Sequence, residues 1–210
     1  LFMKPVFEHA RQSPKRLIYA EGEDERVLRA VQTVVDEGIA KPILVGRPDV
    51  VEARIERLGL RIRVGQNFEL VNPENDPRYK EYWELYHQLM ERDGVSPDDA
   101  RTIVRTNTTA IAALMLRRGE VDAMLCGAYG QYAWHLRYIR NVIGLEQGRR
   151  DVSALSIVIL PKGTIFLCDT HVTPYPTAEE LVEMTELSVE QMRRFGITPK
   201  VALLSHSAFG

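Results

Sequence analysis

A glycine-bounded turn followed by arginines is the first feature of this sequence that could bind a ligand. It follows a run predicted as a short buried strand, Ala123–Cys126. At the carboxyl ends of parallel strands, backbone N–H groups and helix N-termini point at bound anions. Two arginines one turn apart, on the helix expected next, can face the same space. The residues of this candidate anion site are Gly127, Gly130, Arg137 and Arg140.

The same residues also fit an interpretation without a ligand. A turn between a strand and a helix favours small residues, because some of its backbone angles are open mainly to glycine. Arginine is also a common residue on the solvated face of a helix. From the residues alone, both interpretations remain open.

Two further strand ends carry polar side chains. Asp169 ends the apolar run Thr164–Thr170, where a carboxylate can act as a base or a cation ligand but also commonly caps the next turn. Ser205 and Ser207 lie at the end of a strand predicted over Lys200–Ser205, where small hydroxyl side chains can bind phosphate oxygens. These three residues are added to the candidate site.

Other site signatures are missing from the sequence. The five histidines are scattered, without a metal-binding spacing, so no metal site is predicted. The sequence has no nucleophile elbow of the Gly–X–Ser–X–Gly type, no Walker phosphate loop and no dinucleotide fingerprint. Cys126 and Cys168 lie in apolar runs and are expected to be buried free thiols.

Composition narrows the class of protein. The chain has 210 residues and a net charge of −2, and no basic face dominates, so nucleic acid is not an expected partner. No apolar run is long enough to span a bilayer, and we expect a soluble cytoplasmic protein. The chain opens without an initiator Met and ends on a strand-like run, so we expect a piece of a longer polypeptide.

Strand-like and helix-like runs alternate through the first part of the chain. Strands are predicted at Lys15–Ala20 and Pro42–Gly46, each followed by an amphipathic helix, in units of roughly 25 residues. This rhythm predicts an α/β fold with a doubly wound, mostly parallel sheet. The later runs Ser153–Leu160 and Thr164–Thr170 instead predict an antiparallel pair. We therefore expect two lobes, residues 1–148 and 149–210, with the second lobe truncated.

Several longer runs resemble one known family. They are YAEGEDERVLRA, PILVGRP, NPENDPRY, DAMLCGAYG, DTHVTPYPTAEEL and RRFGITPKVALLSHSAFG. They resemble the phosphate acetyl/butyryltransferase family, and within it the C-terminal domain that bacterial NADP-dependent malic enzymes carry. The resemblance covers essentially the whole chain. It implies two α/β lobes similar to isocitrate and isopropylmalate dehydrogenases, a coenzyme A ester in the cleft and a homo-oligomer.

The resemblance assigns roles to some residues of the candidate site. Arg137 falls on the family arginine that follows the glycine turn and is implied to bind the phosphate-bearing substrate. Gly127 and Ala128 match that turn, and Ser205 and Ser207 match the end of a family strand.

The departures from the family pattern concern catalysis. Gly130, Gln131 and Tyr132 stand where free-standing transferases usually carry a His/Thr/Thr-like run. The catalytic Ser/Arg/Asp region of the family lies beyond the last residue of this sequence. We therefore expect no catalytic residue here.

The resemblance implies a regulatory domain that binds acetyl-CoA as effector and self-associates. An upstream malic region of the same polypeptide would use NADP and Mg or Mn. A free-standing phosphate acetyltransferase and a purely structural dimerisation module remain the alternatives.

Overall fold

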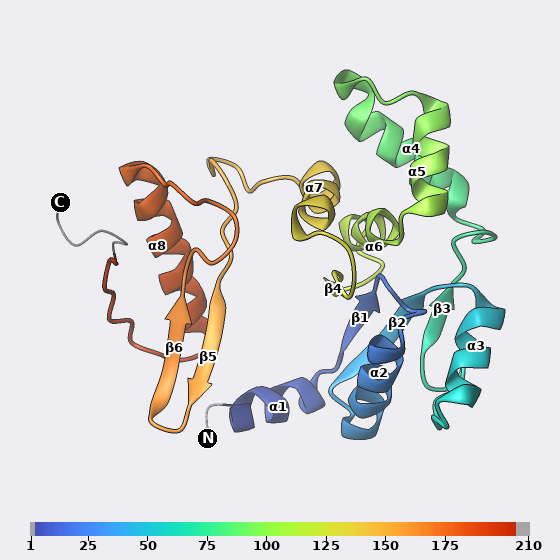
Figure 1. The fold of residues 1–210 in the computed structure, drawn as a ribbon, viewed down its shortest axis with the longest axis horizontal. Helices are drawn as coiled ribbons and strands as arrows, with labels where there is room; N and C mark the ends of the chain where they lie inside the picture. Colours follow the sequence, from blue (N-terminus) through green and yellow to red (C-terminus); the bar gives the residue numbers. More distant parts are fainter. Residues whose placement is uncertain (1–2, 205–210) are drawn as a thin grey trace. The chain divides into compact units, whose positions relative to one another are not determined.

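The computed structural model describes residues 3–204, which form two compact units, Leu1–Gly144 and Leu145–Gly210 (Figure 1). The first unit contains α1 (Met3–Gln12), β1 (Lys15–Tyr19), α2 (Glu25–Glu37), β2 (Ala40–Val45), α3 (Pro48–Arg57), β3 (Glu69–Val71), α4 (Tyr79–Met90), η1 (Glu91–Asp93), α5 (Pro97–Thr106), α6 (Thr108–Arg117), β4 (Ala123–Leu125) and α7 (Tyr132–Ile143). The second contains β5 (Ser156–Leu160), β6 (Gly163–Leu167) and α8 (Ala178–Arg194).

The first unit is built on a four-stranded parallel sheet in the order β3-β2-β1-β4. The chain moves outward from β1 to β2 and β3, then returns through α4, α5 and α6 to place β4 on the other side of β1. Strand order therefore reverses between β1 and β4, and in open α/β sheets ligands bind at such a point, outside the carboxyl ends of the strands. The predicted parallel α/β fold is confirmed.

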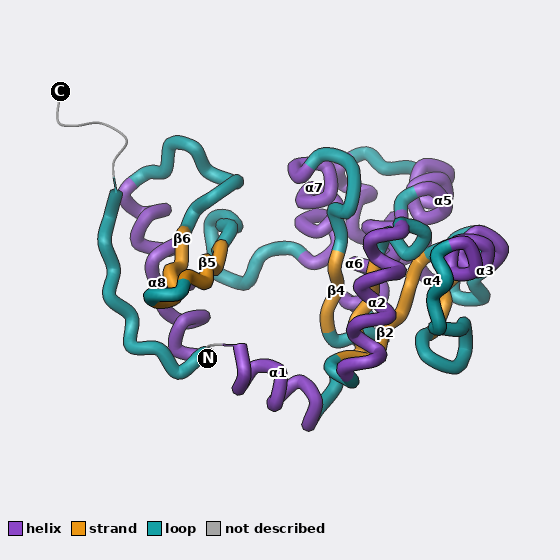
Figure 2. Tube along the Cα trace, turned by 60° about the horizontal axis from the view of Figure 1, so that its bottom comes forward, coloured by secondary structure: helices purple, strands orange, loops and turns teal. Residues whose placement is uncertain are grey.

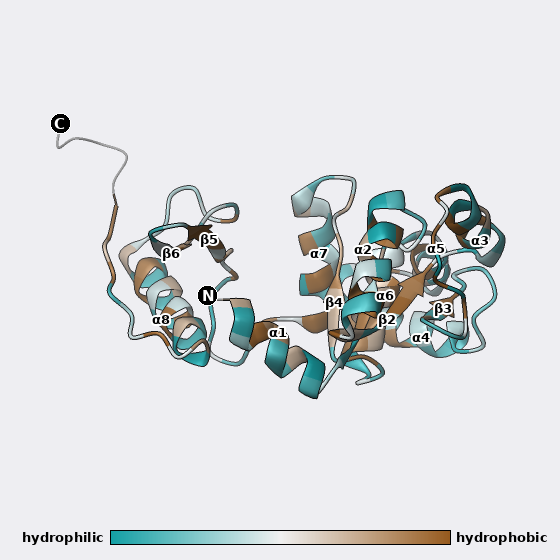
Figure 3. Ribbon diagram, turned by 90° about the horizontal axis from the view of Figure 1, so that it is seen from below, coloured by the Kyte–Doolittle hydropathy of each residue, from teal (hydrophilic) through white to brown (hydrophobic). Residues whose placement is uncertain are grey.

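Alternate residues of the strands face opposite helical layers. Ile18, Ile43 and Val45 belong to the apolar cluster that includes residues of α4 to α7. Tyr19 and Leu44 belong to a second cluster with residues of α2 and α3. Figure 2 shows α2 running alongside β2, and β2 is largely brown in Figure 3. Burial on both faces explains why these strands are continuous apolar runs in the sequence.

Local signals in the sequence set the ends of several helices. The Asp24 side chain caps α2 by accepting the Arg26 N–H, and α2 ends at Gly38 in the left-handed conformation. Helix α8 begins with a capping box, in which the Thr177 side chain accepts the Glu180 N–H.

The aromatic residues of α4 pack into the core. Tyr82, Tyr86 and Met90 are buried in the cluster shared with α5 to α7. The Tyr82 hydroxyl donates a hydrogen bond of 2.6 Å to the Glu120 carboxylate, which satisfies the polar end of this buried ring.

The second unit contains the predicted antiparallel hairpin. β5 and β6 pair from Ser156 opposite Leu167 to Leu160 opposite Gly163. Helix α8 is amphipathic, with teal and brown residues mixed along it in Figure 3, and only Met184 of its side chains is fully buried.

The prediction that Ala123–Cys126 is a buried strand was wrong in its burial. β4 is an edge strand that pairs only with β1. Met124 packs against the cluster of α4 to α7, whereas Leu125 points to the opposite face and is exposed. The helices on that face, α2 and α3, cover β1 and β2 and leave the edge strand open.

The predicted strand over Lys200–Ser205 was also wrong for the residues that the structure describes. Residues 200–204 form no strand, and Val201, Leu203 and Leu204 are exposed. A strand is held by ladder bonds to a neighbouring strand, and within residues 3–204 no strand pairs with this run.

Burial of the cysteines differs from the prediction. Both are free thiols, but Cys126 is half-buried and Cys168 is exposed. Cys126 lies just after an edge strand, and Cys168 follows the last residue of β6, so neither is enclosed by a covered sheet.

Two kinds of feature are missing from the described residues. No helix among residues 3–204 is long and apolar enough to cross a membrane. Within the same range, no three His, Cys, Asp or Glu side chains come together in a way that could hold a metal ion.

Replacing Gly22 with alanine tests the close contact between the turn after β1 and the end of β2. A Cβ atom there would lie 2.7 Å from both the Leu44 Cβ and the Val45 carbonyl oxygen, and backbone cannot yield to it easily. We expect Gly22→Ala to lower the free energy of unfolding by about 1–3 kcal/mol, as overpacking does. Gly38→Ala meets no atom within 4 Å and should cost only about 1 kcal/mol, for its left-handed backbone. Equal thermal midpoints for the two variants would contradict this account.

Candidate functional site

The glycine turn, which we define as residues 126–131, lies where the carboxyl ends of β1 and β4 meet. The Ala20 N–H donates to the Leu125 carbonyl at 2.9 Å, so the two strands stay bonded up to the turn. Gly127 has φ +94° and Gly130 has φ +89°, values that side chains other than glycine rarely adopt. The turn therefore sits at the reversal of strand order, as a ligand site in this fold would.

Glu21 follows β1 and reaches across to the glycine turn. Its side chain is almost completely buried, with the residue 4 % exposed. One carboxylate oxygen accepts the Gly127 N–H at 2.8 Å. In the described part of the chain no arginine or lysine forms a salt bridge with Glu21; its ionisable neighbour is a histidine, His135, at 3.7 Å.

The next two acids are paired with arginines. Glu23 accepts two side-chain hydrogen bonds from Arg47, and Asp24 accepts two from Arg26. These hydrogen bonds are the main reason that the pKa of each carboxyl lies below its ordinary value. Arg26 also donates to the Ala128 carbonyl, which ties the turn to the start of α2.

His135 holds the other end of the turn. It is 5 % exposed, and its Nε2 lies 2.7 Å from the Tyr129 carbonyl oxygen. A carbonyl only accepts, so Nε2 carries the proton, and in the neutral ring Nδ1 accepts from the Thr109 hydroxyl at 2.8 Å. Thr109 is completely buried, so its hydroxyl cannot reach a ligand as a nucleophile. The cluster supports the turn and forms no catalytic set.

Burial and nearby carboxylates raise the pKa of two groups beside the turn. Burial raises the pKa of the Cys126 thiol to about 11, and the Glu21 carboxylate adds to the effect. Burial also raises the pKa of the Tyr129 hydroxyl, with further contributions from Glu21, Glu23 and Asp24. Both shifts mean that forming another negative charge beside the turn is unfavourable.

Aromatic rings are exposed on the turn and on the first residues of α7. Tyr129 is 59 % exposed, Tyr132 51 % and Trp134 42 %, and Leu125 beside them is exposed as well. The Trp134 ring also lies edge-on to His135, with 4.9 Å between ring centres. The turn thus offers a ligand mostly apolar surface.

The predicted arginines lie on α7, the helix that follows the turn. Arg137 is exposed, and its guanidinium lies over the Tyr138 ring, 5.2 Å from the ring centre. Arg140 is exposed one helical turn later. The structure thus gathers Gly127, Ala128 and Gly130 in one turn and places the two arginines on the adjoining helix.

The remaining predicted residues belong to the second unit. The Asp169 carboxylate accepts backbone N–H bonds from Ala154, His171, Val172 and Thr173 at 2.5–3.2 Å. Partial burial alone would raise the pKa of Asp169, but these four bonds outweigh it and the pKa lies below its ordinary value. This is the geometry of a cap, the second of the two roles expected for Asp169.

Ser205 and Ser207 lie outside the described residues. Their predicted role in binding phosphate oxygens therefore stays a prediction.

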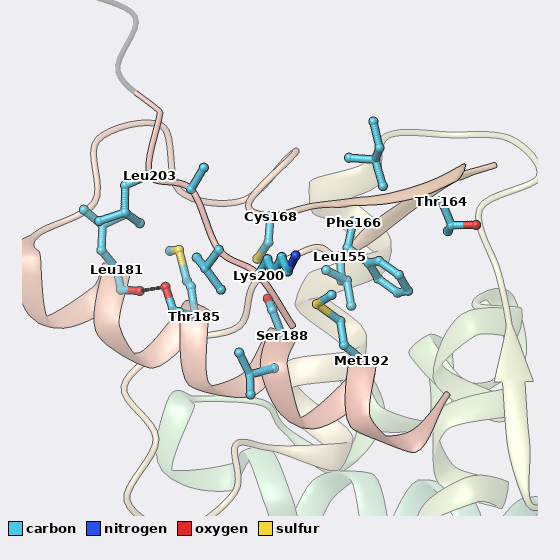
Figure 4. Close-up of a pocket in the computed structure, with 15 residues that line it drawn as sticks. Leu155, Thr164, Phe166, Cys168, Leu181, Thr185, Ser188, Met192, Lys200 and Leu203 are labelled. Carbon is cyan, nitrogen blue, oxygen red and sulfur yellow. Dashed lines mark hydrogen bonds between the residues drawn. The ribbon is translucent and has the colours of Figure 1, made fainter. Parts of the chain in front are cut away.

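A cavity of about 310 Å³ lies inside the second unit. Figure 4 shows Leu181, Ser188 and Met192 of α8 on one wall, with Phe166 of β6 opposite. Lys200 is the single charged residue among the described residues that line it. The walls suit an apolar group and bring together no acid–base pair.

Sequence reasoning missed the two residues that hold the turn. Glu21 was not among the predicted site residues, and His135 was one of five scattered histidines. One signal was available, since Glu21 directly follows a buried strand at the sheet edge where ligands bind. Nothing in the spacing of residues 21 and 135 shows that they meet.

Comparison with known proteins assigns the chain to a family. A family model described as Phosphate acetyl/butaryl transferase matches residues 1–210, the whole chain. The chain belongs to this family.

Curated members of the family resemble the chain to different degrees. It is 51 % identical over 210 residues to an NADP-dependent malic enzyme of Escherichia coli, covering all of this chain and 28 % of that protein. It is 54 % identical over 209 residues to an NAD-dependent malic enzyme of Rhizobium meliloti, and the match covers 99 % of this chain and 27 % of that protein. A phosphate acetyltransferase of Nitratidesulfovibrio vulgaris is 31 % identical over 207 residues, and the match covers 99 % of this chain and 29 % of that protein. The chain thus spans under a third of these relatives.

A solved structure has the same fold as this chain. The phosphotransacetylase from Streptococcus pyogenes superposes with a TM-score of 0.85 at 24 % identity, over 98 % of this chain and 63 % of that one. At this identity the likeness shows the fold alone, and it agrees with the parallel α/β sheet described above.

The raised pKa of Cys126 predicts slow alkylation. With a pKa of about 11, about one thiol in a thousand is ionised at pH 8, and only the thiolate reacts. We expect iodoacetamide to label exposed Cys168 much faster than Cys126, as followed by peptide mass spectrometry. The Cys126 rate should rise about tenfold per pH unit, and Glu21→Gln should raise it at fixed pH by removing a neighbouring negative charge. Equal labelling of both thiols at pH 8 would refute this.

The cap at Asp169 predicts a pH-dependent loss of stability. Asp169→Asn leaves one acceptor oxygen for four N–H groups and turns an amide donor toward them. We expect a loss of about 1–3 kcal/mol in the free energy of unfolding at neutral pH. Because the folded pKa is depressed, the carboxylate stabilises above its ordinary pKa and the difference between variant and wild type disappears as acid protonates it. A thermal midpoint unchanged at pH 7 would argue against the cap.

Proposed function

We propose that the chain is part of an acetyl-CoA-binding regulatory and oligomerisation domain of a malic enzyme. The observation that carries the proposal is identity of about half over the whole chain to malic enzymes. The phosphate acetyltransferase relative shares only 31 %. Because the chain spans 28 % of the Escherichia coli protein, the rest of such a polypeptide would carry the malic reaction.

The parent protein would oxidatively decarboxylate malate to pyruvate in the cytoplasm. It would use NADP and a divalent cation, Mg or Mn, although one malic relative is NAD-dependent and both nicotinamides should be assayed. No described residue of this chain forms a metal cluster, so none is assigned to the cation or the nicotinamide. The chain's own part is to bind the effector and to bring copies of the protein together.

The glycine turn and α7 are the proposed effector site. Ligands of parallel sheets bind where strand order reverses, and the turn lies there with exposed rings of Tyr129 and Trp134 around it. Arg137 and Arg140 are exposed on the helix that follows, where a guanidinium can meet a phosphate with charge-assisted hydrogen bonds. Asp169 keeps its loop in shape.

Inhibition requires that acetyl-CoA bind two states of the protein with different affinity. An effector with equal affinity for both states shifts nothing, however tightly it binds. A homo-oligomer offers such states, because subunits that rotate against each other change the shape of sites far from the interface.

A free-standing phosphate acetyltransferase is the second candidate. It is favoured by the acetyltransferase relative and by the shared family. In that reaction phosphate attacks the acetyl carbonyl of acetyl-CoA, the thioester bond breaks, and acetyl phosphate and the CoA thiol leave. Gly130, Gln131 and Tyr132, in place of the polar run expected of such enzymes, weigh against it.

Assays of the full-length protein separate these functions. Malate oxidation should occur with NADP or NAD and should fall as acetyl-CoA is added, while acetyl phosphate formation from acetyl-CoA and phosphate should be absent. Clear acetyl phosphate formation would establish the transferase instead. A protein that binds no acetyl-CoA by calorimetry would leave only the structural dimerisation role.

Replacing Arg137 tests the effector site. A charge-assisted hydrogen bond is worth about 1.5–3 kcal/mol, so Arg137→Ala should raise the acetyl-CoA concentration for half-inhibition at least about tenfold. Arg92→Ala, which removes an arginine from the distant turn η1, is the matched control and should leave half-inhibition unchanged. Half-inhibition unaffected by Arg137→Ala would remove this residue from the site.

A further inference from the structure

The buried carboxylate of Glu21 stands where a bound anion would stand in a glycine turn. In turns that bind phosphate, free backbone N–H groups point at the ligand oxygens. Here the Gly127 N–H already donates to a Glu21 oxygen at 2.8 Å. A phosphate could use this N–H only by displacing a buried side chain of the same charge.

Glu21 is also not neutralised by a strong cation. Glu23 and Asp24, the other acids near the turn, are each paired with an arginine. Within residues 3–204, Glu21 has no such partner, and its ionisable neighbour is His135, whose Nδ1 lies 3.7 Å from the Glu21 Oε1 and also contacts the Thr109 hydroxyl. The Glu21 carboxylate therefore faces the turn without the arginine partner that each of the other two acids has.

The groups beside the turn respond to this charge. The raised pKa of Cys126 and that of Tyr129 both include a contribution from Glu21. Around the turn, the large side chains that a ligand can reach include the exposed rings of Tyr129, Tyr132 and Trp134. Burial against such a surface is favourable for apolar and amide groups of a ligand. A phosphate there would lose its bound water and lie close to the carboxylate of Glu21.

We propose that Glu21 is an internal occupant of the anion position, so that the glycine turn binds an uncharged part of its ligand and excludes phosphate. The uncharged part is of the acyl-thioester and amide class, the acetylpantetheine arm if the ligand is acetyl-CoA, a step that rests on the proposed function. The phosphates of the ligand then bind elsewhere, at arginines such as Arg137. Glu21 thereby selects which end of the ligand enters the turn.

The test uses the full-length protein with three probes, which are acetyl-CoA, neutral S-acetylpantetheine and inorganic phosphate. Affinity is measured by calorimetry, and the site is located by backbone amide exchange over residues 121–135. In the wild-type protein, acetyl-CoA and S-acetylpantetheine should slow exchange in this segment and compete with each other, while phosphate should do neither.

The variant Glu21→Gln keeps an oxygen acceptor for the Gly127 N–H and removes the charge. Phosphate should now slow exchange in the segment. It should also bind at least about tenfold more tightly to the variant than to the wild type, because a like charge a few ångströms away has been removed. S-acetylpantetheine should bind within about threefold of the wild type. Glu52→Gln, which removes an exposed carboxylate of α3, is the control and should behave as the wild type does.

Two results would overturn the inference. One is inorganic phosphate slowing exchange in the wild-type turn as strongly as acetyl-CoA does. The other is acetyl-CoA protecting the turn while S-acetylpantetheine does not. Both comparisons of probes can be made on the wild type alone, so the inference stays testable even if the variant unfolds.

Failure of the proposed function gives a different pattern. In that case acetyl-CoA would not bind to the wild-type protein at all. The exclusion of phosphate by Glu21 would then be supported if phosphate protected the turn only in Glu21→Gln, and overturned if phosphate protected it in neither or in both.

Discussion

The hydrogen bond from the Gly127 N–H to the Glu21 carboxylate joins the ends of the two strands between which the sheet reverses. A buried carboxylate without water costs several kcal/mol unless polar groups replace the water. Glu21 receives a backbone N–H and a nearby imidazole. Removing it would leave the Gly127 N–H without its acceptor and the turn free to change shape. The geometry of the candidate site therefore depends on this contact.

The parallel sheet could be predicted because its strands are apolar on both faces, and this shows in the sequence as continuous apolar runs. Continuous apolar strands such as Pro42–Gly46 are buried on both sides, and helix ends carry local signals, such as Gly38 after α2. These features depend on neighbours in sequence, which is why periodicity shows them. The burial of β4 could not be predicted in the same way, because an edge strand and a central strand read alike over three residues.

The candidate site was predicted only in outline for a related reason. The turn and its glycines follow from local sequence, since positive φ values demand glycine. Glu21 and His135 are 114 positions apart in the sequence. They meet because Glu21 follows β1 and His135 lies on α7, which follows the turn at the end of the neighbouring strand β4. Asp169 looked like a possible ligand, yet its carboxylate accepts three backbone N–H groups of its own loop and a fourth from Ala154, which precedes β5. Such partners are invisible before the chain folds.

Gly130 explains why the turn departs from the pattern expected of free-standing transferases. A Cβ atom on Gly130 would lie 3.1 Å from the His135 Nε2, the atom that holds the Tyr129 carbonyl, and φ there is +89°. A side chain at this position would press on the imidazole and strain the backbone at once. Gly130 and His135 therefore form one arrangement. A turn with a side chain at position 130 would have to shift the imidazole by a few tenths of an ångström and accept a strained backbone, so it would hold the Tyr129 carbonyl differently.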